Sequence, residues 1–355
     1  MQRRDCLAWA AASLAATWGQ HGAAQTMDGP QPRQEQARLP FDRMQARAGY
    51  LQRLRSIQQR GLIPLIDVES SYNPHKLDVA AFVSDMDTVG MIMCASAEQP
   101  SNLVNKGQLW SDHSLELQRA YPTHFIPVGN GGGHPAWSEH GSAFLDAAEQ
   151  FLVADGYPMM GEFEFHHYPS PRQVQRGDMH RDVQIAIDGP LGHRLFALAE
   201  KTGLPFQLHY EIEDVLLPPL ESMLQQYPKA TVIWCHFDQI RYSARSTLYG
   251  PSMLAQWLQR YPQLYVDTAM GHAGSVYELS GERHSRYWTR KSEWHEVMAA
   301  HPYRFLAALD IGGDRTDSLL LWGRRRREFI QSLPDALRER VAYKAAWKLI
   351  YHEEI

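Results

Sequence analysis

The segment Leu65-Ile66-Asp67-Val68-Glu69-Ser70-Ser71-Tyr72 contains most of an apolar run that covers residues 62–68. A continuous apolar run of this length is typical of a strand that is buried on both faces. The run ends at Glu69, and Ser71 follows on the same face of an extended chain. The segment therefore predicts a buried strand that presents a carboxylate and a hydroxyl at its carboxyl end.

Similar apolar runs recur along the chain and alternate with amphipathic segments that have helical spacing. The expected strands are 62–68, 89–95, 125–128, 159–165, 205–210, 231–237, 264–268 and 304–309. The expected helices include 41–59, 142–154, 191–201, 214–226, 251–260 and 334–351. Buried strands separated by helices indicate a parallel sheet. Eight of them in a chain of this length predict a (β/α)8 TIM barrel, with an open doubly wound sheet as the alternative.

The bulk composition fits an ordinary globular protein. The chain has 355 residues, of which 44% are hydrophobic and 21% charged, with a formal net charge of -5. This charge gives no electrostatic basis for binding nucleic acid or an anionic membrane. The basic run Arg324-Arg325-Arg326-Arg327 is short and precedes Glu328, so we interpret it as a solvated helix face.

The N-terminal 25 residues have the organisation of an export signal. Arg3-Arg4 precedes an apolar run over 8–18 and small residues around 23–24, a pattern that resembles a twin-arginine signal. A fortuitously basic N-terminus before a short helix is the alternative. Spanning a membrane needs about 20 apolar residues, so the run is too short. We therefore expect a signal peptide over 1–25, a polar linker over 26–40, a barrel domain over 41–355 and a periplasmic or secreted protein.

Three glycine-rich or long segments follow expected strands. The run 129–133, Gly-Asn-Gly-Gly-Gly, lacks the Lys-Ser/Thr ending of a phosphate cradle, so we interpret it as a flexible active-site loop. Long insertions over 169–190 and 271–303 follow the fourth and seventh expected strands, at the end of a barrel where active sites lie. Loops of this length are often functional lids. The aromatic residues of the second insertion could line a pocket or pack within the lid.

Ionisable side chains gather at the ends of five expected strands. The set is Glu69, Glu162, Glu164, His209, His236 and Asp310. Each residue alone has a structural alternative, such as a hydrogen-bonded histidine or an ion pair with arginine. Burying them all is costly without pairing or a metal, so the set indicates a site for Zn²⁺, Fe²⁺ or Mn²⁺. Asp310 could accept a proton from a metal-activated water. His134, His166 and Arg315 are further candidates for substrate binding.

Over residues 60–350 the pattern resembles the amidohydrolase superfamily, especially its amidohydrolase-related decarboxylase and hydrolase branch. The resemblance rests on 66–69 (Ile-Asp-Val-Glu), 205–209 (Pro-Phe-Gln-Leu-His), 232–236 (Val-Ile-Trp-Cys-His) and 305–310 (Phe-Leu-Ala-Ala-Leu-Asp). The pair Gly161-Glu162 is similar to the Gly-Glu of barrel nucleases, whose glutamate binds metal.

The resemblance implies roles for individual residues. His209 would bind a metal, His236 would bind the metal or the substrate, and Asp310 would bind metal and act as the general base. Glu162 or Glu164 would replace the carboxylated lysine or glutamate that bridges two metals in some members. The usual His-x-His of the first strand is replaced by Glu69-Ser70-Ser71, although some decarboxylases carry Glu-x-His, so Glu69 could still coordinate.

These implications lead to one functional expectation and two alternatives. We expect a hydrolase with one divalent ion, zinc being the first candidate, that acts on a small-molecule ester, lactone, amide or phosphoester. Arg315 would hold an anionic substrate, and a homo-oligomer is possible. The alternatives are a metal-free ligand-binding barrel and a decarboxylase of the same superfamily.

Overall fold

The computed structural model describes residues 39–98, 107–177, 179, 181–277, 279–312 and 318–355. The expected signal peptide, most of the expected linker and Arg315 lie outside these residues. No helix of the described chain is both long enough and apolar enough to cross a membrane.

All eight expected strands are present in the described chain. They are β1 Leu65–Tyr72, β2 Met91–Glu98, β3 Phe125–Pro127, β4 Met160–His167, β6 Phe206–Tyr210, β7 Val232–Trp234, β8 Leu264–Asp267 and β11 Phe305–Leu306. They form two sheets, with the orders β1-β2-β3 and β11-β8-β7-β6-β4-β5, where β5 is Val183–Gln184. Every pairing among the eight is parallel, as their continuous burial predicted.

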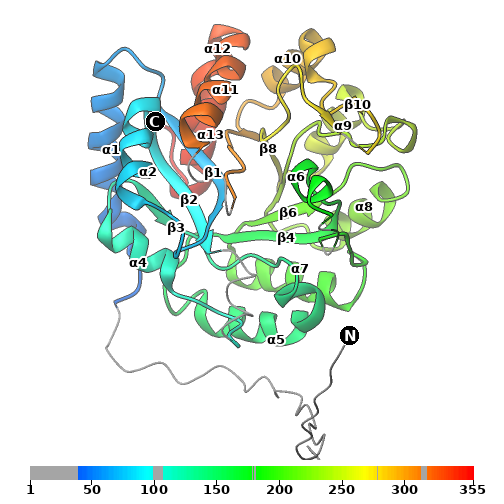
Figure 1. The fold of residues 1–355 in the computed structure, drawn as a ribbon, viewed down its shortest axis with the longest axis horizontal. Helices are drawn as coiled ribbons and strands as arrows, with labels where there is room; N and C mark the ends of the chain where they lie inside the picture. The colour runs from blue at the N-terminus through cyan, green and yellow to red at the C-terminus, as the bar shows by residue number, and fades with distance from the viewer. Residues whose placement is uncertain (1–38, 99–106, 178, 180, 278, 313–317) are drawn as a thin grey trace, which may run out of the picture.

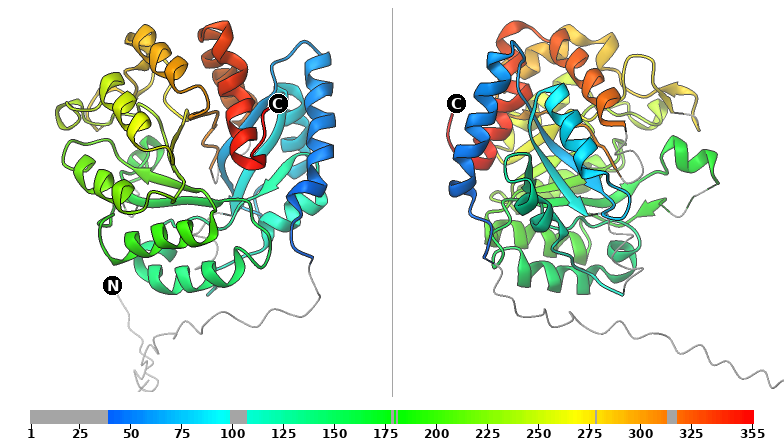
Figure 2. Two further views of the ribbon diagram at one scale, coloured as in Figure 1. Left: turned by 180° about the vertical axis from the view of Figure 1, so that it is seen from behind. Right: turned by 60° about the vertical axis from the view of Figure 1, so that its left-hand side comes forward.

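Backbone contacts join the two sheets at both edges. Gly129 and Gly132, just after β3, form parallel bridges with Met160 and Phe163 of β4. At the other edge, Ser70 of β1 forms a parallel bridge with the residue that follows Asp310, and the Asp310 amide donates to the Glu69 carbonyl at 3.1 Å. The joins are isolated bridges, and the result is a TIM-barrel-like α/β fold with helices outside the strands (Figures 1 and 2).

The helices follow the strands in chain order. They are α1 Arg43–Gln59, α2 Val79–Val89, α4 His113–Ala120, α5 Ala136–Phe151, α6 Pro171–Gln175, α7 Pro190–Thr202, α8 Leu217–Gln226, α9 Pro251–Arg260, α10 Lys291–Ala300, α11 Leu319–Ser332, α12 Asp335–Glu339 and α13 Ala345–Tyr351. Helices α7, α8 and α9 have proline in the first turn, where its missing N–H costs nothing. The single helix expected over 334–351 is divided by a π-helical segment, Arg340–Lys344.

An aromatic cluster fixes which face of β4 points inward. Trp137 of α5 packs edge-on against Phe163 and Phe165 of β4, with ring centroids 5.2 and 5.4 Å apart. Successive side chains of a strand alternate between faces. Glu162 and Glu164 therefore point to the face opposite the helices.

Two interpretations from the sequence are wrong. The run 129–133 is not a flexible loop, because its backbone pairs with β4, and a Cβ on Gly131 would lie 2.5 Å from the Glu162 carbonyl oxygen. The basic run is not a solvated face: Arg326 is only 7% exposed, and Arg327 donates from Nε to the Val89 carbonyl at 2.6 Å. The helix carries these two residues on its inner side, which the local charge pattern does not reveal.

The two long insertions have structure of their own. The first contains α6 and β5, and the second contains β9 Val276–Tyr277, β10 Glu282–Arg283, a 3-10 turn Tyr287–Thr289 and α10. Trp294 is fully buried and packs edge-on against Phe237 at 4.6 Å. Its aromatic ring therefore contributes to the core beneath the insertion.

Candidate metal centre

Three side chains from neighbouring strands lie within contact distance of one another. Glu162 comes from β4, His209 from β6, and His236 lies two residues after β7. Glu162 Oε1 lies 2.7 Å from His209 Nδ1 and 3.1 Å from His236 Nε2. The two ring nitrogens are 3.0 Å apart. These potential ligand atoms all lie within 4.8 Å of one another.

The donor types of this trio suit a small divalent cation. Zinc binds histidine nitrogen and carboxylate oxygen at about 2.0–2.2 Å, so two ligands on one tetrahedral ion are about 3.3–3.6 Å apart. The three separations in the trio are shorter, as expected for atoms in direct hydrogen-bond contact. Two imidazoles with one carboxylate suit zinc, iron or manganese, and the trio could hold one metal ion.

Each imidazole is anchored through the nitrogen that points away from the trio. His236 Nδ1 lies 3.2 Å from the Ala269 carbonyl oxygen, and His209 Nε2 lies 3.3 Å from Glu211 Oε1. Metal-binding histidines usually donate their second N–H to a carboxylate or a carbonyl, which fixes the tautomer and leaves the other nitrogen as a ligand. The contacts here leave His209 Nδ1 and His236 Nε2 facing each other.

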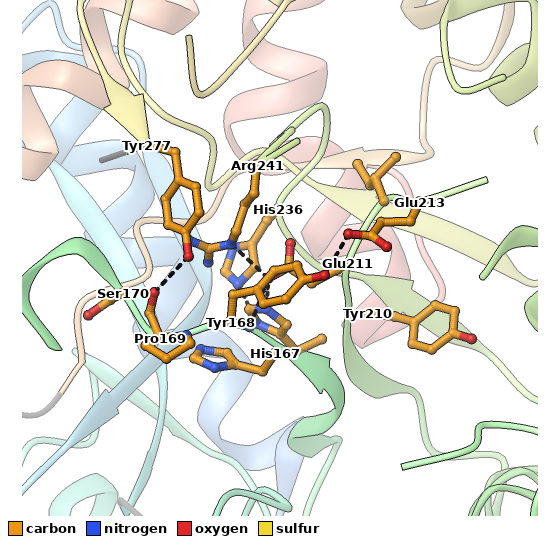
Figure 3. A network of polar contacts seen from close by, with 12 residues as sticks. His167, Tyr168, Pro169, Ser170, Tyr210, Glu211, Glu213, His236, Arg241 and Tyr277 are labelled. Carbon is orange, nitrogen blue, oxygen red and sulfur yellow. Dashed lines mark hydrogen bonds and ion pairs between the residues drawn. The ribbon is translucent and has the colours of Figure 1, made fainter. Parts of the chain in front are cut away.

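Glu211 is itself held by a network that extends away from the trio (Figure 3). Its Oε1 accepts from Arg241 Nε at 2.7 Å and from the Tyr168 amide at 3.3 Å. Burial opposes ionisation of Glu211, but Arg241 and His209 hold its pKa below the usual value. The carboxylate is therefore charged and fixed when it contacts His209.

The charges of the trio favour a bound proton, which a metal cation could replace. Burial opposes ionisation of Glu162, yet His209 and His236 hold its pKa well below the usual value. Burial lowers the pKa of His209, but Glu162 and Glu211 outweigh it and raise that pKa to about 9. A proton thus balances the buried carboxylate, and a metal ion would take the place of that proton.

The backbone at these strand ends adopts rare conformations. His236 has φ 62° and Asp310 has φ 50°, in the left-handed region that non-glycine residues seldom occupy. Asp267, at the end of β8, holds the turn at His236 because its Oδ1 accepts from the amides of His236 and Ala269, each at 2.9 Å. Such strain persists only where surrounding contacts impose it, and it is frequent at functional sites.

Glu69 and Asp310 border the trio. Glu69 is 4% exposed, and its Oε2 has no hydrogen-bond partner among the described residues. Burial, followed by the charges of Asp310 and Glu162, raises its pKa well above the usual value. Asp310 is close enough to raise the pKa of His236, after the larger effects of burial and Glu162. Their roles as metal ligands and, for Asp310, as general base stay predictions.

A buried arginine lies on the same side of the fold as these carboxylates. Burial lowers the pKa of Arg326 to about 10, while Asp267, Asp67, Glu69 and Asp310 each act in the opposite direction. This guanidinium from α11 supplies positive charge near Glu69, at the strand that lacks the His-x-His pattern.

Other residues expected at the site lie in different surroundings. Glu164 forms an ion pair with Arg181 and accepts from the His134 amide at 3.3 Å. It lies two residues beyond Glu162, about 6.6 Å farther along the strand. His134 Nδ1 contacts Ser138 Oγ at 2.7 Å, and His166 is a half-buried residue of β4. Substrate contact by His134 and His166 stays a prediction.

Sequence reasoning missed Glu211, Arg241 and Asp267. A signal existed for two of them, because Glu211 shares a strand face with His209, and Asp267 is the penultimate residue of the seventh expected strand. Nothing in the sequence linked Arg241 to Glu211. A small recess lies beside these side chains, lined by His209, Tyr210, Glu211, Ile212, Cys235, His236 and Gln239.

Comparison with known proteins gives one family match. The family model described as amidohydrolase matches residues 139–350. No curated protein matches the chain significantly.

Solved structures with this fold share little sequence with the chain. A provisionally assigned amidohydrolase from Staphylococcus aureus has 13% identity and a TM-score of 0.51, with 81% of this chain and 99% of that chain covered. A 2,6-dihydroxybenzoate decarboxylase, complexed with 2,6-dihydroxybenzoate, has 13% identity and a TM-score of 0.48 over the same shares. At this identity the likeness to the Staphylococcus aureus protein concerns the fold alone.

Proposed function

Because the chain belongs to the amidohydrolase family and is an enzyme, we propose that it is a metal-dependent hydrolase of a small-molecule ester, lactone, amide or phosphoester. We further propose that its eight strands form a (β/α)8 barrel with the catalytic centre at the carboxyl ends. In this proposal, residues 1–25 direct export to the periplasm.

One observation carries the proposal. His209 Nδ1 and His236 Nε2 face the same oxygen of Glu162 at 2.7 and 3.1 Å, while their other nitrogens are anchored by Glu211 and the Ala269 carbonyl. A purely structural histidine pair would not need both rings oriented with a nitrogen toward one point. We assign Glu162, His209 and His236 as the residues that hold one ion, zinc being the first candidate.

The first strand supports a single ion. Glu69 and Ser71 replace two imidazoles, and burial favours the uncharged form of Glu69. A hydroxyl and a neutral carboxyl are poor ligands for a second transition metal. The positive charge of Arg326 lies near the same carboxylates and opposes a second cation there.

The chain's own residues then have distinct tasks. A bound zinc ion would supply a Lewis acid that polarises the scissile group and acidifies a water molecule. Glu211 holds the His209 ring, and Asp267 holds the backbone of His236. Asp310, whose charge reaches His236, accepts the proton of the attacking water and returns it to the leaving group.

Metal analysis tests the proposal. Elemental analysis of the purified chain should find about one zinc, iron or manganese ion per molecule, and His209→Ala or Glu162→Ala should lose most of it. His193→Ala is a matched control, because the His193 ring lies on α7 and its Nδ1 contacts the Tyr227 hydroxyl at 2.9 Å. Metal-free wild-type protein, or His209→Ala with full metal content, would overturn the assignment. Assays for released acid and for CO₂ distinguish hydrolysis from decarboxylation.

A further inference from the structure

We propose that Arg241 binds a carboxylate of the substrate beside the metal centre, so that this enzyme acts on anionic small molecules. The inference rests on the proposed function, since it places the substrate at the same centre. It adds a substrate class and a residue that determines specificity.

Arg241 is buried with only part of its guanidinium paired. The side chain is 5% exposed, and its Nε donates to Glu211 Oε1 at 2.7 Å. Its Nη1 is fully buried and has no hydrogen-bond partner within the described chain. A buried charged donor without a partner is costly. The free arm of the fork is therefore available to an oxygen that arrives with a ligand.

The guanidinium is held in one orientation. It lies over the ring of Tyr277, 4.9 Å from the centroid, and the Arg241 carbonyl accepts from Ser280 Oγ at 2.6 Å. The Tyr277 hydroxyl donates to the Pro169 carbonyl at 3.2 Å. Both long insertions thus meet around Arg241, as Figure 3 shows for Tyr277 and Pro169. A preorganised arginine fork suits a planar carboxylate better than a mobile lysine would.

Arg241 is also adjacent to the proposed metal centre. Glu211 Oε1 contacts both Arg241 Nε and His209 Nε2, at 2.7 and 3.3 Å, so one carboxylate oxygen separates the guanidinium from a metal-binding imidazole. The charge of that carboxylate is shared between the two groups. A substrate that binds the metal and extends past the His209 ring would bring its anionic group to Arg241.

A second arginine in the same segment, Arg245, serves as a comparison for Arg241. Arg245 lies over Tyr242 at 4.3 Å, and its Nη1 contacts the Tyr168 hydroxyl at 2.8 Å and Glu213 at 3.4 Å. This second arginine repeats the arrangement of arginine, tyrosine and glutamate. Its side chain is 53% exposed, however, so water can satisfy its remaining donors. Arg245→Gln is therefore the matched control for Arg241→Gln.

The test measures binding of benzoate and of its neutral analogue benzamide to the zinc-supplemented chain by calorimetry. Charge-assisted hydrogen bonds are worth about 1.5–3 kcal/mol, so Arg241→Gln should weaken benzoate binding about 10- to 100-fold. Benzamide binding should not change, and Arg245→Gln should bind both compounds as the wild type does. The variant Arg241→Lys keeps a charged partner for Glu211 but lacks the planar fork, so it should show the same selective loss if Arg241→Gln folds poorly.

Three results would overturn the inference: no benzoate binding by the wild type, wild-type benzoate affinity in the Arg241 variants, or equal losses for benzoate and benzamide. Zinc content is measured on the same samples. A chain without metal that still loses benzoate binding on Arg241→Gln would contradict the metal assignment while retaining the anion site. A zinc-loaded chain whose benzoate affinity does not depend on Arg241 would contradict the anion site while retaining the metal assignment.

Discussion

Replacement of Glu211 by glutamine tests whether the network behind His209 serves the metal. Glu211 Oε1 accepts from His209 Nε2 at 3.3 Å, from Arg241 Nε at 2.7 Å and from the Tyr168 amide at 3.3 Å. Glutamine keeps the shape and one acceptor oxygen but removes the charge that orients the imidazole. Loss of such a contact typically reduces metal affinity 10- to 100-fold, which corresponds to about 1.4–2.8 kcal/mol. The buried Arg241 also loses its charged partner, so the free energy of unfolding should fall by about 3–5 kcal/mol.

The assay is a zinc competition titration against a chelator of known affinity, with denaturant unfolding on the same samples. Glu213→Gln is the control, because Glu213 accepts from the Tyr168 hydroxyl at 2.6 Å and pairs with Arg245 rather than with His209. Its zinc affinity should equal that of the wild type. Equal zinc affinity in Glu211→Gln and the wild type would refute the role of Glu211, whatever the change in stability.

Two further predictions concern the frame of the site. Gly131→Ala should lower the free energy of unfolding by about 1–3 kcal/mol, because its Cβ would lie 2.5 Å from the Glu162 carbonyl oxygen. Denaturant titration measures this change. Gly274→Ala is the control, because its Cβ meets only a histidine ring at 3.3 Å. A change no larger than that of the control would contradict the close approach. Burial raises the pKa of Asp67 to about 6 from 3.8, so between about pH 4 and 6 the folded chain binds this proton more readily than the unfolded chain. Its contribution to stability should then fall by roughly 3 kcal/mol as pH rises through that window. Asp67→Asn should flatten this slope, measured by unfolding at a series of pH values, and an unchanged slope would show that another group is responsible.

The positions of the strands could be predicted because a buried strand is a continuous apolar run in the sequence. A run such as 159–165 is apolar throughout, and β4 indeed covers Met160–His167. Alternation along that strand also placed Glu162 and Glu164 on one face. The sequence could not show which of the two glutamates meets His209, because that depends on how β4 is staggered against β6. This register has irregularities on both sides of the two glutamates.

Contacts between distant segments leave no such pattern in the local sequence. Glu211 and Arg241 are thirty residues apart and meet at 2.7 Å. The glycines after β3 were misread for the same reason, since their lack of side chains permits pairing with β4 as readily as it permits flexibility. Likewise the helical position of Arg326 places it inside the fold, although its neighbours in sequence are basic.

The sequence by itself determined the order of strands and helices and the residue types available at the strand ends, because both depend on the periodicity of neighbouring residues. It also carried the departure at Glu69-Ser70-Ser71, which limits a second metal position. Only the tertiary structure decided that Glu162, His209 and His236 meet within 4.8 Å and that Arg241 Nη1 has no hydrogen-bond partner among the described residues. Those distances depend on strand stagger and on the packing of two insertions, which are properties of the whole fold.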